Sequence, residues 1–141
     1  MNLYLLDSDH LSLHQRGHDS LSSHLLKIPP EQVCISVISA EELIRGRLAQ
    51  VNRKKEPDER VRAYYWLSKT LDFLCGFNIL KYSPHAEAHF QNLRSRKIRV
   101  GIQDLKIAAI ALSNQATLVT RNRRDFDQIP SLPIQDWSTL P

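Results

Sequence analysis

The chain has few of the residues that mark specialised architectures. Its 141 residues include four glycines, two cysteines and one methionine. Cys34 and Cys75 lie far apart with no metal-binding spacing, and each neighbours apolar residues, so both are predicted to be reduced thiols in the core. No repeat, low-complexity segment or long Gly/Ser linker interrupts the sequence. A single domain over residues 1–141 is therefore predicted.

Long hydrophobic runs are also absent. The longest, residues 105–112, is interrupted by Lys106 and is far too short to span a bilayer. The first residues include no basic segment, and Asp7 ends their short apolar run, so no signal peptide is expected. We therefore expect a cytoplasmic protein with no membrane partner.

The charges that are present favour a polyanionic partner. There are 19 Lys and Arg residues against 15 Asp and Glu residues, which gives a formal net charge of +4. The basic residues gather in three groups, within residues 45–55, 94–99 and 121–124. A solvated helix end explains any one such group, but three of them near the acidic residues discussed below favour contact with an RNA or DNA backbone.

Short apolar runs alternate with longer helical patterns along the chain. Helical patterns lie between the runs, beginning with a polar segment that reaches Lys27. Strands that alternate with helices need crossover connections, which favour a mostly parallel sheet, so the predicted fold class is α/β. Five strands are predicted, at residues 3–6, 33–37, 77–82, 117–120 and, as a short edge strand, 133–134.

Three helical segments carry more specific predictions. Ser39 is expected to cap the helix after the second strand, with Glu42 in its first turn at the S-x-x-E spacing of a capping box. The segment 102–114 is apolar nearly all round and should lie buried against the sheet. A long helix is predicted over residues 57–74, with an apolar face formed by Val61, Tyr64, Tyr65, Trp66, Leu67, Leu71 and Leu74.

Acidic and polar residues follow the predicted strands at corresponding places. Asp7 directly follows the first strand, Glu42 follows the second, and Asp104 begins the helix before the fourth. The fourth strand itself is followed by Thr120, Asn122 and Asp125. In parallel α/β sheets, functional groups collect beyond the carboxyl ends of the strands, so these residues are expected to meet at one edge.

A cluster of carboxylates suits a divalent cation. Mg²⁺ and Mn²⁺ prefer oxygen ligands, and a bound cation relieves the repulsion between crowded carboxylates. It can also activate a water for attack on a phosphodiester. Each acid alone could instead be a helix cap or a favourable charge at a helix start. The i,i+4 histidine pairs, His10/His14 and His85/His89, are expected to pack rather than bind zinc, because no Cys or Glu-rich motif accompanies them.

Four blocks contain the acidic residues and their neighbours: LLDSDHL at residues 5–11, ISVISAEELIRG at 35–46, DLKIAAIA at 104–111 and LVTRNRRDF at 118–126. These blocks resemble the PIN-domain family, in particular the VapC group of ribonuclease toxins from type II toxin–antitoxin modules. The resemblance spans nearly the whole chain, and the closing segment 132–137 also fits it. In the family's second block the glutamate that precedes the leucine is the metal-site acid, which selects Glu42 over Glu41.

This resemblance implies a three-layer α/β/α PIN-like sandwich with a mostly parallel five-stranded sheet. It also implies an Mg²⁺ or Mn²⁺ site that cleaves RNA endonucleolytically, a homodimer, and a cognate antitoxin that inhibits the enzyme. Many PIN domains carry a fourth acid where this chain has Asn122. The metal-site residues implied are Asp7, Glu42 and Asp104, with Asp125 contributing, and Thr120 and Asn122 positioning water.

Two other functions remain as alternatives. The D-x-D pattern of Asp7 and Asp9 after a strand is also found in haloacid-dehalogenase-type phosphatases, where the first aspartate is a nucleophile. Those enzymes need a later lysine and a paired-aspartate motif, and no convincing pair is found. A PIN module that binds RNA or an antitoxin without cutting is the second alternative. The RNA target, the cut site and the number of metal ions stay open.

Overall fold

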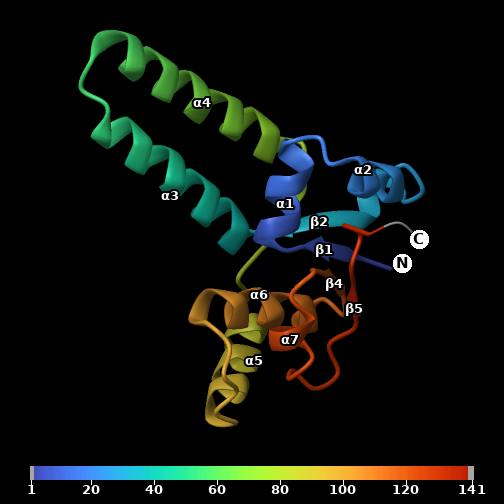
Figure 1. Ribbon diagram of the computed structural model, residues 1–141. Coiled ribbons are helices and arrows are strands. Elements are labelled where there is room, and N and C mark those ends of the chain that lie inside the picture. Colours follow the sequence, from blue (N-terminus) through green and yellow to red (C-terminus); the bar gives the residue numbers. More distant parts are fainter. Residues whose placement is uncertain (1, 140–141) are drawn as a thin grey trace.

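The computed structural model describes residues 2–139 as a parallel sheet between two groups of helices (Figure 1). The sheet has five strands in the order β3-β2-β1-β4-β5, and every neighbouring pair is parallel. The predicted α/β class and five-stranded sheet are therefore confirmed. The strands are β1 (Tyr4–Leu6), β2 (Val33–Ser36), β3 (Asn78–Leu80), β4 (Thr117–Val119) and β5 (Ile134–Gln135).

Helices connect the strands as the predicted crossovers. A short 3₁₀ turn, Pro30–Gln32, leads into β2. The helices are α1 (Ser8–Gln15), α2 (Asp19–Leu25), α3 (Val37–Arg53), α4 (Pro57–Cys75), α5 (Pro84–Ser95), α6 (Ile102–Ser113) and α7 (Arg123–Phe126).

Both faces of the sheet are covered, because successive strand residues point to opposite sides. Leu5 and Leu118 pack into one core with buried residues of α5 and α6. Leu6 and Val119, the next residues on the same strands, pack into a second core with residues of α1 and α2. The predicted three-layer sandwich is confirmed, and α6 is buried against the sheet as expected.

The strand order reverses beside β1, because β2 and β3 lie on one side of it and β4 and β5 on the other. Leu6 pairs with Ile35 of β2 and with Val119 of β4. The residues that follow these strands therefore leave the sheet at the same level. In an open parallel sheet this is the position where ligands bind.

Two helix boundaries differ from the sequence-based predictions. The polar segment that reaches Lys27 is two helices rather than one, because Gly17 adopts φ +76°, a conformation that glycine takes without steric cost. Ser36, not Ser39, caps α3: its hydroxyl accepts the Ser39 N–H at 3.0 Å. The helix thus begins earlier than predicted, and Glu42 lies in its second turn.

Helices α3 and α4 form a hairpin that projects away from the sheet (Figure 1). Most residues of the predicted apolar face of α4 lie outside the core. Leu74, at the end of the helix nearest the sheet, is buried. The prediction for the cysteines is right for Cys34, which is buried, and wrong for Cys75, which is exposed. The large exposed residues of α4 are Val61, Tyr64, Tyr65, Trp66 and Leu71.

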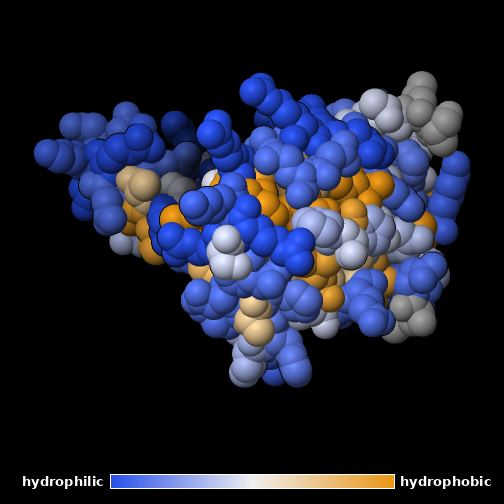
Figure 2. Space-filling model, turned by 90° about the horizontal axis from the view of Figure 1, so that it is seen from below, coloured by the Kyte–Doolittle hydropathy of each residue, from blue (hydrophilic) through white to orange (hydrophobic). Residues whose placement is uncertain are grey.

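The surface on the side of α5 and α6 differs from that of the α3–α4 hairpin. Seen from the side of α5 and α6, hydrophobic residues show between hydrophilic ones in the middle of the body, whereas the part of the hairpin visible in this view is mostly hydrophilic (Figure 2). Ile102, at the start of α6, is one exposed apolar residue. Over residues 2–139, none of the helices is long and apolar enough to cross a membrane.

Candidate active site

Asp7 lies at the junction of β1, β4 and α1. Its backbone N–H donates to the Val119 carbonyl at 3.0 Å, which continues the pairing of β1 with β4 beyond the strand ends. Its side chain caps α1, because Oδ1 accepts the His10 N–H at 2.7 Å. Asp7 is 6% exposed. The capping role considered for Asp7 is therefore real, and it holds the carboxylate in place at the strand edge.

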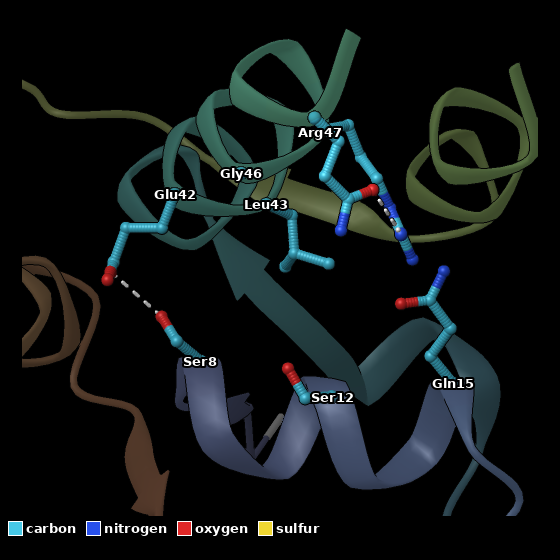
Figure 3. Close-up of a pocket in the computed structure, with 8 residues that line it drawn as sticks. Ser8, Ser12, Gln15, Glu42, Leu43, Gly46 and Arg47 are labelled. Atoms are coloured by element: carbon cyan, nitrogen blue, oxygen red, sulfur yellow. Dashed lines mark hydrogen bonds between the residues drawn. The ribbon is translucent and has the colours of Figure 1, made fainter. Parts of the chain in front are cut away.

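Glu42 is brought to the same edge by a serine contact between α1 and α3. The Ser8 hydroxyl donates to Glu42 Oε1 at 2.9 Å (Figure 3). Ser8 Oγ also lies 2.9 Å from Ser39 Oγ. No contact of Ser8 was predicted from the sequence. Its partner lies 34 residues away, and no local pattern indicates such a contact.

Asp104 adds a third carboxyl group from the first turn of α6. Burial raises the pKa of Asp104, and the negative charges of Asp7, Glu42 and Asp125 raise it further. The predicted acidic residues are therefore close enough for Asp104 to experience the charge of all three others. Carboxyl groups crowded in this way are a donor set that suits a hard divalent cation.

The residues after β4 form a tight polar turn. Thr120 is fully buried, and its Oγ1 accepts the Asn122 N–H at 3.0 Å. Asn122 caps α7, where its Oδ1 accepts the Asp125 N–H at 3.3 Å and its Nδ2 donates to Asp125 Oδ2 at 3.0 Å. Thr120 thus supports the turn rather than reaching solvent, and Asp125 shares its carboxylate with Asn122.

A cavity of about 590 Å³, which we call the acidic cavity, opens beside these residues. Asp9 and Arg121 form its charged wall: Nε and Nη2 of Arg121 donate to the two Asp9 oxygens at 2.6 and 3.1 Å. This ion pair joins residues 112 positions apart, so only the β1–β4 pairing brings it together. The cavity is lined by Asp7, Ser8, Asp9, Asp104, Arg121, Asn122 and Phe126.

His10 lies next to this site but is part of the core. Within residues 2–139, one ligand atom from each of Asp7, Asp9 and His10 lies within 4.8 Å of the others. His10 is fully buried, and its Nε2 accepts the Trp137 N–H at 3.3 Å. Arg121 already neutralises the charge of Asp9. The other carboxylates of the site, which have no such partner within the described part of the chain, are therefore better ligands for a cation that enters from the cavity. The expected packing role of His10 agrees with this burial, which is greater than predicted.

Comparisons with known proteins agree with this architecture. A family model described as "PIN domain" matches residues 4–132. The chain is 30% identical over 141 residues to "Ribonuclease VapC2" of Rickettsia felis, covering 96% of this chain and 98% of that protein. It is 31% identical over 110 residues to "tRNA(fMet)-specific endonuclease VapC" of Salmonella typhimurium, covering 75% of this chain and 76% of the relative.

A solved structure shares the fold over nearly the full length of both chains. "Crystal structure of DNA bound VapBC from Salmonella typhimurium" contains a chain with a TM-score of 0.77 and 27% identity, with 97% of this chain and 99% of that one covered. The match argues against the phosphatase alternative, because it covers the blocks that carry the acidic residues. The chain therefore belongs to the PIN-domain family, and its relatives place it in the VapC group.

Proposed function

We propose that this protein is a divalent-metal-dependent endoribonuclease and the toxin of a type II toxin–antitoxin module. The observation that carries the proposal is the crowding of carboxyl groups at the carboxyl edge of the sheet, where burial and the charges of three other acids raise the pKa of Asp104. The relatives are named as a ribonuclease and an endonuclease, which supports the same activity. We also propose that the chain forms one domain over residues 1–141 and that it acts in the cytoplasm.

Asp7, Glu42 and Asp104 are the proposed ligands of Mg²⁺ or Mn²⁺, with Asp125 contributing through a water. A bound cation of this kind supplies a more acidic water and offsets negative charge on the phosphodiester. Burial raises the pKa of Asp104, and the negative charges of the other acids raise it further. This repulsion between carboxylates supports the assignment, because a cation would offset it.

The chain's own residues position the reacting groups. Ser8 fixes Glu42 through its hydroxyl, and Asp7 is held by the start of α1. Asn122 lines the acidic cavity and is the proposed water-positioning group. Thr120 is a positioning residue that acts through Asn122, because it is buried and holds the Asn122 backbone.

RNA is the proposed substrate, cut by attack of a water on phosphorus with departure of one ribose oxygen. Arg121 supports this proposal, because its guanidinium lies in the wall of the acidic cavity and keeps N–H donors for a phosphate beyond its two bonds to Asp9. A transfer RNA is the first substrate to test, since one relative is named as specific for tRNA(fMet).

Protein partners are a cognate antitoxin and a second copy of the chain. The similar Salmonella structure is a VapBC assembly bound to DNA, which supports the first of these partners. Contiguous exposed apolar residues mark interaction sites in soluble proteins. The exposed face of α4 supplies such a surface, with Val61 71% and Tyr64 53% exposed.

The test is cleavage of a mixed RNA pool with Mg²⁺, with Mn²⁺ and with EDTA. Discrete products that need metal are expected from the wild-type chain and should vanish in Asp7→Asn, because asparagine still caps α1 but carries no charge. Asp19→Asn is the matched control, since Asp19 is an exposed acid in the first turn of α2. Equal cleavage by Asp7→Asn would refute the mechanism. RNA binding without products in any metal would favour the non-catalytic module.

A further inference from the structure

A second cavity adjoins the acidic cavity and runs between α1 and α3 (Figure 3). We call it the α1–α3 groove. Ser8 lines both cavities and bonds to Glu42, so the groove begins at the acidic edge of the sheet. Its volume is about 330 Å³, and its lining residues are Ser8, Ser12, Gln15, Glu42, Leu43, Gly46, Arg47 and Gln50.

The far part of the groove is polar and carries a positive charge. Ser12 and Gln15 extend from α1 toward α3, where Arg47 faces them (Figure 3). Hydroxyl and amide groups both donate and accept hydrogen bonds, as ribose hydroxyls and phosphate oxygens require. The groove thus changes from acidic at Glu42 to basic at Arg47.

The guanidinium of Arg47 is fixed in the groove wall. Its Nε donates to the buried Thr70 Oγ1 at 3.0 Å, and its Nη1 donates to Gln50 Oε1 at 3.2 Å. The group also lies 5.5 Å from the centre of the Trp66 ring. A guanidinium has five N–H donors, so donors remain for an anion after these contacts.

Arg47 also keeps its charge available. Among residues 2–139, no carboxylate oxygen lies within 4.0 Å of its guanidinium. Arg45 of the same helix is paired with Glu41, and Arg121 of the acidic cavity is paired with Asp9. A fixed, unpaired guanidinium next to an open groove is a favourable place for a phosphate.

The dimensions of the groove suit one nucleic-acid strand. Ser8 and Gln15 are separated by about 10 Å along α1, at 1.5 Å per residue. Stacked nucleotides of one strand advance about 3.4 Å each. The groove volume of about 330 Å³ matches the pockets of roughly 300–1,000 Å³ that hold small ligands. It therefore accommodates a short stretch of a single strand.

We infer that the α1–α3 groove binds the sugar–phosphate backbone of single-stranded RNA beside the bond that is cut, with Arg47 contacting a phosphate. The inference rests on the proposed function for the place of the cut, but the groove's RNA binding can be measured separately. The acidic cavity repels a polyanion when no cation is bound. Arg47 offsets this repulsion at the other end of the groove and sets the path of the strand.

Gly46 offers a test that leaves the groove's hydrogen bonds intact. It is exposed within α3, and a Cβ added there meets no atom within 4 Å. Gly46→Glu and Gly46→Lys introduce opposite charges at the groove with side chains that favour helices. Asn52→Glu and Asn52→Lys are the matched controls, because Asn52 is exposed on the same helix about 240° around from Gly46.

The measurement is binding of a labelled single-stranded RNA of mixed sequence in EDTA, followed by fluorescence anisotropy. Gly46→Glu is expected to weaken binding by about tenfold, and Gly46→Lys to keep or increase it, with much smaller changes for the Asn52 pair. Arg47→Gln should also weaken binding by about tenfold and reduce the slope of log K against log salt by about 0.7. Thermal unfolding verifies that each variant folds.

Two results overturn the inference: no measurable RNA binding by the wild-type chain, or equal effects of the charge changes at Gly46 and Asn52. Cleavage assays separate it from the proposed function. If the wild-type chain cuts RNA and Gly46→Glu and Arg47→Gln bind and cut as it does, the groove inference alone is wrong. If no variant cuts RNA but the charge effect at Gly46 is present, the groove inference stands and the proposed cleavage fails.

Discussion

Helices α4 and α6 both carry many apolar residues, yet only α6 buries them. Six residues of α6, from Leu105 to Ala111, are buried against α5 and the sheet. On α4 only Ala63, Thr70 and Leu74 are buried, and five large apolar or aromatic residues are exposed. An apolar helix face therefore indicates that a surface will be covered, but not whether the same chain covers it.

The difference follows from where each helix lies. Helix α6 precedes β4 and crosses the sheet, so strands and α5 surround it. Helix α4 packs along α3 in a hairpin that projects from the sheet, and only its last turns return to the core (Figure 1). One face of a helix in a two-helix hairpin is left without a partner.

The largest expected effect is on the stability of the core. Ile110→Ala in α6 should lower the free energy of unfolding by about 2–5 kcal/mol, because it leaves a cavity in a fully buried site. Val61→Ala in α4 should change it by about 0.5 kcal/mol or less, since Val61 is 71% exposed. Urea unfolding measures both. Comparable losses would show that α4 is covered in solution.

The next effect concerns association through α4. The double variant Val61→Asp/Leu71→Asp should weaken self-association at least tenfold, because it places charges on an apolar surface that a second copy would bury. Analytical ultracentrifugation measures the dissociation constant. The far-ultraviolet circular dichroism of the variant should match the wild type. An unchanged dissociation constant would exclude this face from the proposed homodimer.

A smaller effect is expected where α6 meets the acidic cavity. The raised pKa of Asp104 means that the folded state holds a proton more tightly than the unfolded state, whose carboxyl has the ordinary value of 3.8. Its charge therefore lowers stability at neutral pH, and this loss disappears as pH falls toward and below 3.8. Asp104→Asn should raise the free energy of unfolding at neutral pH in EDTA, with a gain that shrinks on acidification.

The stability of the same two proteins can also be measured with divalent metal present. Mg²⁺ or Mn²⁺ should raise the unfolding temperature of the wild-type chain, because a ligand of the folded state stabilises it by mass action. The increase should be smaller for Asp104→Asn. If both proteins respond equally, Asp104 is not a ligand.

The smallest expected effect is on the pH dependence of stability at the buried end of α4. His14 of α1 lies near the Phe73 and Phe77 rings, with centroids 5.7 and 5.8 Å away. Burial lowers the pKa of His14 below its ordinary value of 6.5. Its stabilising contribution is therefore present above pH 6.5 and is lost as pH falls through the lower, folded-state value. His14→Phe should flatten this part of the stability profile in urea unfolding, and an unchanged profile would contradict it.

Much of the site was predictable because the signals are local. The strands end where the apolar runs end, and Asp104 begins the helix that leads into β4, so Asp7 and Asp104 could be placed at the edge of a parallel sheet. Glu42 was placed at the same edge, although its helix begins earlier than predicted. The prediction that Ser39 caps the helix failed because two serines, Ser36 and Ser39, precede Glu42. The strand β2 ends at Ser36, so Ser36 becomes the capping residue of α3.

The contacts that assemble the site were not predictable from local pattern. Ser8 bonds to Glu42, Asp9 to Arg121 and Arg47 to Thr70 only because separate helices and strands pack together. Nothing near Ser12 and Gln15 indicates a groove, since its other wall belongs to α3.

The amino-acid sequence by itself determined the α/β alternation, the burial of α6 and the acids at the strand ends, because periodicity and strand ends are properties of neighbouring residues. The tertiary structure alone decided which apolar faces are covered and which polar side chains meet. The physical reason is that burial and hydrogen bonding between distant segments depend on the pairing of strands and the packing of helices. The exposed face of α4 and the fixed Arg47 are both products of the hairpin that α3 and α4 form.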